Sequence, residues 1–101
     1  MDIFREINQK GHERVLFWND PDAGLNAIIA IHSTTLGPAL GGCRIWPYNN
    51  TQDAIRDVLR LSRAMTYKAS VCGINLGGGK SVIIGSQPKN REAVFRSFGR
   101  F

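Results

Sequence analysis

Hydrophobic positions in the first third of the chain form short runs that are typical of β-strands. Residues 15–18 and 25–32 are rich in β-branched and aromatic side chains, and residues 19–24 between them contain the Asn, Asp, Pro and Gly of a tight turn. Two such runs joined by a short polar turn predict a β-hairpin. Before the hairpin, a looser alternation over residues 2–10 predicts a short helix.

In the middle of the chain the hydrophobic period changes from that of a strand to that of a helix. A glycine-containing loop over residues 33–42 and an expected strand over residues 43–46 come first. Thr51 is the expected N-cap of a helix of about four turns that ends near residues 67–68. Its sheet-facing stripe is expected to contain Ile55, Val58, Leu59, Ser62 and Met65.

The last third of the chain predicts one more strand and one more helix. Residues 81–85 form a buried-type strand directly after three glycines and a lysine, and Asn90 is the expected cap of a helix that reaches Phe101. Strands followed by crossover helices predict an α/β domain with three layers, α/β/α, around a mixed, partly parallel sheet. The last helix has no stop signal, so we expect the chain to be the N-terminal part of a longer protein.

Composition and charge exclude several classes of protein. With 43% hydrophobic and 21% charged residues the chain resembles ordinary globular proteins. It has neither a membrane-length apolar run nor a signal-peptide layout, so we expect a cytoplasmic protein without a membrane partner. Residues 51–101 are basic, but their positive charges are spread singly and accompany no recognition motif, so we expect no nucleic-acid partner. Cys43 and Cys72 are predicted to be reduced, buried thiols, and no metal site is expected.

The triple glycine and the lysine after it carry the clearest chemical signal. Glycines beside a strand cost backbone entropy, so either a ligand approaches the backbone there or two chain segments cross tightly. A P-loop is not matched, because Gly73 stands one position too early and a strand follows Lys80, and no dinucleotide fingerprint is present. An ammonium entering a buried strand must be paired or lose its proton, and Lys68 nearby would favour that loss. Lys80 is then a general base and Lys68 an anion binder, or both are solvated surface lysines.

Four segments in fixed order resemble the amino-acid dehydrogenases that act on leucine, valine, phenylalanine and glutamate. The leucine-type enzymes are the most similar, with the phenylalanine and valine types as alternatives. This resemblance implies NAD-dependent oxidative deamination of an L-amino acid to a 2-oxo acid and ammonia. The similar segments are residues 36–44, 57–62, 65–68 and 77–80.

The resemblance also implies a role for individual residues. Lys80 matches the family's catalytic lysine, which activates water, and Lys68 matches the lysine that binds the substrate α-carboxylate. Leu40 and Met65 match an apolar pocket for the substrate side chain, while two glycines match positions where substrate and nicotinamide approach the backbone. The implied substrate-binding positions besides Lys68 are Leu40, Gly41, Met65, Gly77 and Gly78.

Part of the family's machinery matches nothing in the chain. Its proton-transferring aspartate and its nucleotide-binding domain are absent, so residues 1–101 are expected to form a substrate-binding and oligomerisation domain that is inactive alone and binds no NAD itself. A homo-oligomer is expected. A hypothesis of another class is a non-catalytic assembly module, suggested by an apolar stripe near the end of the chain: Val94, Phe95, Phe98 and Phe101.

Overall fold

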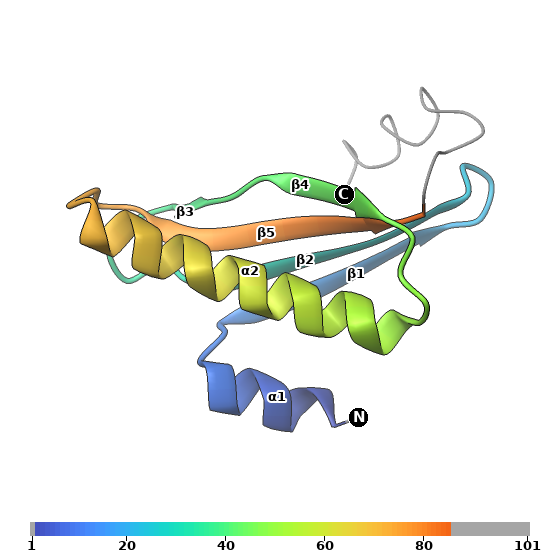
Figure 1. Ribbon diagram of the computed structural model, residues 1–101, viewed down its shortest axis with the longest axis horizontal. Helices are drawn as coiled ribbons and strands as arrows, with labels where there is room; N and C mark the ends of the chain where they lie inside the picture. Colours follow the sequence, from blue (N-terminus) through green and yellow to red (C-terminus); the bar gives the residue numbers. More distant parts are fainter. Residues whose placement is uncertain (1, 86–101) are drawn as a thin grey trace.

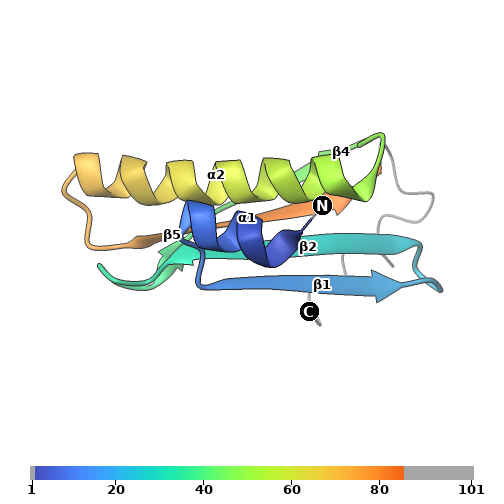
Figure 2. The same cartoon turned by 90° about the horizontal axis from the view of Figure 1, so that it is seen from below.

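Two helices lie on one face of a mixed sheet in the part of the chain that the structure, a computed structural model, describes, residues 2–85 (Figures 1 and 2). The predicted hairpin, the following strand and the long helix are all present. In chain order the elements are α1 (Ile3–Lys10), β1 (Arg14–Asp20), β2 (Leu25–Ser33), β3 (Ala39–Leu40), β4 (Cys43–Trp46), α2 (Thr51–Val71) and β5 (Gly77–Ile84).

The strand β5 is the centre of the sheet. On one side it pairs antiparallel with β2, which in turn pairs antiparallel with β1 to form the hairpin. On the other side it pairs in parallel with two short strands in succession, first β3 and then β4. Five strands therefore occupy four positions across the sheet, and the edge beside β5 is broken between β3 and β4. The predicted mixed, partly parallel sheet is confirmed.

The helix α2 connects β4 to β5 and covers the sheet. Its sheet-facing side chains are the predicted ones, with Met65 half-buried and the arginines of the opposite face exposed. The predicted ends are wrong. Asn50 is the N-cap, because its side-chain oxygen accepts from the N–H of Asp53 at 2.8 Å. The helix continues to Val71 because Ala69 still packs in the core, and it stops only before Gly73, whose φ is +72°.

Two predictions about the glycines and the loop before them are corrected. Gly77, Gly78 and Gly79 lie inside β5 and not before it. The loop expected over residues 33–42 contains the two-residue strand β3, whose backbone pairs with these glycines. Two residues are too few for a hydrophobic period, so only the neighbouring strand defines β3.

The two faces of the sheet are covered differently. The face under α2 holds the larger core cluster, which includes Ile28, Val58, Leu59 and Val82. The opposite face holds a smaller cluster, formed by Leu25 and Ala27 of β2 and Ile83 of β5. Residues 2–85 thus form two layers. The last helix expected, on which the third layer depends, lies outside the described residues.

The cysteines are exposed, although burial was predicted. Cys43 is the first residue of β4, an edge strand, and Cys72 is the C-cap of α2. Both thiols are free of disulfides. Within residues 2–85 no helix combines the length and the apolar character that a membrane span requires.

Candidate functional site

Lys80 lies in the central strand β5, beside the gap between β3 and β4. Its pairing partner on β2 is the fully buried Ala30, so the side chain leaves the sheet on the side of α2. Its Nζ lies 3.3 Å from where a Cβ on Gly42 would stand. Lys80 is half-buried, and no carboxylate or hydrogen-bond acceptor among residues 2–85 pairs with its amine. The amine is therefore available to a ligand at this edge.

A hollow of about 420 Å³ lies at the same break in the edge, on the helix-free face of the sheet, because Ile29 and Ile31 alternate with Ile28 and Ala30, which pack under α2. Isoleucine side chains of β2 and the glycine backbone make it largely apolar, with a single amine beside it. It brings together Lys80 and Gly41 of the predicted site. Its lining is Ile29, Ile31, Ala39, Gly41, Gly42, Cys43, Gly79, Lys80 and Ser81.

Lys68 and Lys80 come from elements that touch each other. A Cβ on Gly78 would lie 2.2 Å from the backbone nitrogen of Thr66 and 2.4 Å from the carbonyl oxygen of Ser62, so β5 and α2 are in backbone contact there. Lys68 lies two residues beyond Thr66, and Lys80 lies two residues beyond Gly78. Lys68 is exposed and, like Lys80, has no ion-pair partner in the described part of the chain.

Lys68 lies on the flank of α2 that faces the broken edge. Asp57, three helical turns earlier on nearly the same line, forms an ion pair with Arg44 of β4 at 3.6 Å. Met65 is on this flank as well and is half-buried. The predicted carboxylate-binding lysine and one predicted pocket residue thus share the side of α2 on which β4 and Lys80 lie.

Three predicted site glycines are required by tight crossings of the chain. A Cβ on Gly41 would lie 1.8 Å from the carbonyl oxygen of Gly79, and one on Gly77 would lie 1.7 Å from that of Ser33. Gly78 meets α2 in the same way. Of the two explanations that the sequence left open, the crossing of segments accounts for these positions. For Leu40 the structure describes the backbone alone, in β3 beside Gly78.

The triple glycine does not form a phosphate cradle. The N–H of Gly77 donates to the carbonyl of Pro38 at 3.0 Å, and Gly78 and Gly79 pair within the sheet. Pyrophosphate binding needs free N–H groups at a helix N-terminus. The triple glycine therefore does not fit a dinucleotide, and residues 2–85 contain no group of three His, Cys, Asp or Glu side chains placed to hold a metal ion.

A buried histidine pair behind the α2–β5 contact was not predicted. His12 Nε2 lies 2.7 Å from Ser62 Oγ and 2.9 Å from the carbonyl oxygen of Leu59, to which it donates. His32 Nδ1 lies 2.8 Å from Thr66 Oγ1, and the two rings meet edge to face at 4.8 Å. Burial, with His32 alongside, lowers the pKa of His12 to about 4. Isolated histidines 20 positions apart carry no periodic signal, so only the fold reveals the pair.

A second polar cluster joins β4 to α2 and was also missed. Burial disfavours the charge of Asp57, but hydrogen bonds from Tyr48 and Arg60 outweigh it and lower the pKa of its carboxyl. Arg44 adds its ion pair and stacks on Trp46 at 4.5 Å. The cluster orients the flank of α2 that carries Lys68.

Residues 12–101 match the family model of the dimerisation domain of Glu/Leu/Phe/Val dehydrogenases. The chain belongs to this family. It is 57% identical to the leucine dehydrogenase of Geobacillus stearothermophilus, over the whole chain and 28% of that enzyme. It is 56% identical to the phenylalanine dehydrogenase of Lysinibacillus sphaericus, over 99% of the chain and 26% of that enzyme.

A solved dehydrogenase has the same fold over the matching region. The L-tryptophan dehydrogenase of Nostoc punctiforme superposes with a TM-score of 0.93 at 49% identity, covering 98% of the chain and 30% of that structure. The chain therefore spans between a quarter and a third of the length of these relatives. Leucine and phenylalanine dehydrogenases are about equally similar to it.

Proposed function

We propose that residues 1–101 form the substrate-binding and oligomerisation part of a cytoplasmic NAD-dependent amino-acid dehydrogenase, with leucine as the first candidate substrate and phenylalanine or valine as alternatives. The reaction is the reversible oxidative deamination of an L-amino acid to a 2-oxo acid and ammonia. The supporting observation is that two lysines, neither with an ion-pair partner among residues 2–85, flank the α2–β5 contact in a chain of this family.

The two amines have separate tasks in this proposal. The exposed amine of Lys68 is a compact charge with three rotatable donors, suited to the α-carboxylate of the substrate. The half-buried amine of Lys80, when neutral, accepts a proton from water as that water adds to the imine carbon of the oxidised substrate. Returning that proton to the nitrogen lets ammonia leave, and the carbonyl of the 2-oxo acid forms as the hydroxyl that came from water gives its own proton to the amine.

The remaining predicted residues would surround the substrate side chain. Met65 lies on the same flank of α2 as Lys68 and would face the substrate side chain there, whereas Ile29 and Ile31 line the hollow on the opposite face of the sheet. Leu40 and Gly41 belong to the broken edge. Gly77 and Gly78 would act indirectly, because their missing side chains let β5 cross Ser33 and α2 closely and so position Lys80. An apolar pocket separates side chains that differ by one methylene only about 10- to 200-fold, so related substrates are expected to compete.

The rest of the enzyme would lie in the remainder of the parent protein. Since the described glycines offer no nucleotide cradle, NAD belongs to a separate nucleotide-binding domain, together with the proton-transferring aspartate. The apolar cluster on the helix-free face, which includes Leu25, Ala27 and Ile83, would be covered by a further layer to complete an α/β/α domain.

A chimaera tests this function directly. The chain replaces the N-terminal segment that it matches in the leucine dehydrogenase of Geobacillus stearothermophilus, and NAD reduction is measured with L-leucine, L-phenylalanine and L-valine. We expect turnover by the chimaera and none by the 101-residue chain alone. A folded chimaera without activity towards any of the three amino acids would contradict the proposal, and turnover by the isolated chain would contradict its incompleteness.

A second candidate function is a non-catalytic assembly module. The family model describes a dimerisation domain, and residues 2–85 expose large apolar side chains such as Phe17 and Leu16. In that case the chain self-associates while the chimaera stays inactive. The activity of the chimaera distinguishes the two, because both include self-association. A monomer in light scattering at high concentration would remove the assembly module.

A further inference from the structure

The hydroxyl of Thr66 lies inside the contact between α2 and β5. A Cβ on Gly78 would stand 2.2 Å from Thr66 Oγ1 and 2.2 Å from the backbone nitrogen of Thr66, so this hydroxyl packs directly against the backbone of β5. Lys68 follows Thr66 by two residues on α2, and Lys80 follows Gly78 by two residues on β5. The hydroxyl therefore stands where the two backbones that carry the lysines meet.

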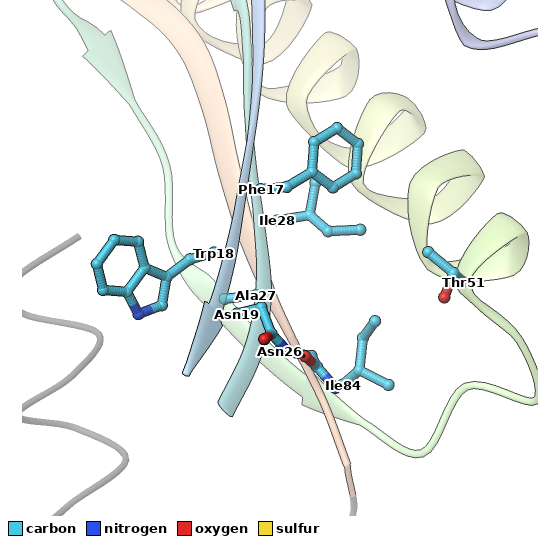
Figure 3. Close-up of a pocket in the computed structure, with 8 residues that line it drawn as sticks. All are labelled: Phe17, Trp18, Asn19, Asn26, Ala27, Ile28, Thr51 and Ile84. Atoms are coloured by element: carbon cyan, nitrogen blue, oxygen red, sulfur yellow. Dashed lines mark hydrogen bonds between the residues drawn. The ribbon is translucent and has the colours of Figure 1, made fainter. Parts of the chain in front are cut away.

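His32 of β2 binds this hydroxyl from the sheet. Figure 3 shows Ile28 on the side of α2, and His32, four residues further along β2, lies on the same face. The carbonyl oxygen of Lys10, 2.9 Å from Nε2 of His32, can only accept a hydrogen bond, so Nε2 carries the ring proton. Nδ1 is then the acceptor, and the hydroxyl of Thr66 donates to it at 2.8 Å. His32 is 7% exposed, so water has little access to this bond.

Thr66 and Lys68 lie on opposite sides of α2, because two residues along an α-helix correspond to a rotation of about 200°. Lys68 shares its flank with Asp57, whose ion pair with Arg44 attaches that flank to β4. The bond between Thr66 and His32 attaches the other flank to β2. Two attachments on opposite sides oppose a rotation of α2 about its own axis. Such a rotation would move the amine of Lys68 relative to β5.

We propose that His32 is a positioning residue for substrate binding. Through the hydroxyl of Thr66 it holds α2 in the rotation at which Lys68 can bind the carboxylate of the amino acid. This inference rests on the proposed function and adds to it a residue that acts through Thr66 and Lys68. Without the bond α2 samples other rotations, and the apparent affinity for the substrate falls with the fraction of molecules in which Lys68 is in place.

Two substitutions of His32 separate its bond to Thr66 from the rest of the ring. In the chimaera, His32→Asn keeps an oxygen acceptor near the place of Nδ1, whereas His32→Gln carries its amide near Nε2 and leaves Thr66 without an acceptor. His32→Gln should raise KM for the amino acid about two- to tenfold, the factor that corresponds to one hydrogen bond, and should leave KM for NAD unchanged. His32→Asn should retain most of the affinity for the amino acid. Partial unfolding would lower the amount of active enzyme, and with it the apparent kcat, without raising KM.

Thr66 offers a second matched pair of variants. Thr66→Val removes the hydroxyl and should reproduce the rise in KM caused by His32→Gln. Thr66→Ser keeps the hydroxyl and should not. Circular dichroism checks that each chimaera is folded. The inference is overturned if the folded His32→Gln chimaera has an unchanged KM for the amino acid, or if His32→Asn raises KM as much as His32→Gln does.

Combination with Lys68→Met tests whether the effect passes through Lys68. In that chimaera His32→Gln should no longer change KM, because the charge that it positions is gone. A further rise in KM of the same size would mean that His32 acts independently of Lys68, and would overturn the inference. These results leave the proposed function intact, since the unaltered chimaera is active in each of them. A folded but inactive unaltered chimaera overturns the proposed function, and this inference with it.

Discussion

Lys68 and Lys80 differ in their exposure to solvent, and this difference separates their expected effects. Lys80 is half-buried beside the hollow, while Lys68 is exposed on the flank of α2. In the chimaera, Lys80→Met should lower kcat about 10²- to 10⁴-fold, the usual contribution of a general acid–base group. Lys68→Met should act mainly by raising KM for the amino acid, because it removes the charge that holds the carboxylate.

Lys10 is the matched control for the lysine variants. Its side chain pairs with Glu6 at 2.7 Å on α1 and takes no part in the proposed site. Such an i,i+4 pair on a helix contributes about 0.2–0.5 kcal/mol, so Lys10→Met should leave both kinetic constants unchanged. If Lys80→Met behaved like this control in steady-state assays, Lys80 would have no catalytic role.

His12 should make the stability of the chain depend on pH. Its pKa is about 4 in the folded chain, because burial disfavours the charge, against about 6.5 when unfolded. Between these values only the unfolded chain binds the proton, so the free energy of unfolding falls as the pH falls from about 6.5 to 4, by about 3 kcal/mol in total. Above pH 7 this contribution is constant.

Urea unfolding at several pH values measures the effect of His12. His12→Gln removes the titrating ring, so its stability should vary less between pH 7 and 4.5 than that of the unaltered chain. Carboxylates titrate equally in both proteins and cancel in the comparison. The idea fails if the two pH profiles run parallel.

At the scale of elements, the contact between β5 and α2 depends on a missing side chain. Gly78→Ala would place a Cβ 2.2 Å from the backbone of Thr66, so strand and helix must move apart, at an expected cost of about 3 kcal/mol. Gly79→Ala is the control within the same strand. Its Cβ meets its nearest neighbours at 3.4 Å, so about 1 kcal/mol or less is expected.

Thermal unfolding of the two alanine variants tests why these positions are glycine. The alternatives are a close crossing of β5 with another segment and the approach of a ligand to the backbone. A large loss for Gly78→Ala and a small one for Gly79→Ala support the crossing as the reason for Gly78. Comparable losses would show that the whole triplet is needed for another reason, such as β5 backbone conformation.

The elements themselves were largely predictable, because their signals are local. The hairpin, β4 and the buried face of α2 follow from turn residues and hydrophobic spacing within a few positions, as in Ile55, Val58 and Leu59. The predicted N-cap of α2, Thr51, is one residue later than the observed N-cap, Asn50. Asn50 and Thr51 are both good caps, and only the backbone geometry distinguishes them.

At the scale of the whole molecule, the sheet has one closed face and one apolar face without a helix among residues 2–85. Under the proposed function the rest of the enzyme covers the second face. The isolated chain should then bind more of the dye ANS than an equal concentration of chimaera, because ANS reports exposed apolar surface. Fluorescence titration of both proteins measures this, and equal binding would argue against a covering layer.

The sequence proposed residues for the candidate site but did not indicate their arrangement, and their roles stay predictions. The motif resemblance named Lys68, Lys80 and their neighbours, since these residue types and spacings are specific. It did not indicate that the backbone of α2 occupies the space where a side chain at Gly78 would stand. Nor did it indicate that His32 forms a hydrogen bond with Thr66 next to that contact. Such contacts join residues more than ten positions apart and leave no period in the sequence.

The sequence by itself determined which segments become strands and helices, and which family the chain resembles, because these depend on residue types at short spacing. Only the tertiary structure decided that the glycines are part of β5, that two histidines are buried together, and that β1 is the outer strand of the sheet formed by residues 2–85. The physical reason is that burial, backbone crossing and strand pairing depend on which distant segments meet, and local residue preferences do not specify that.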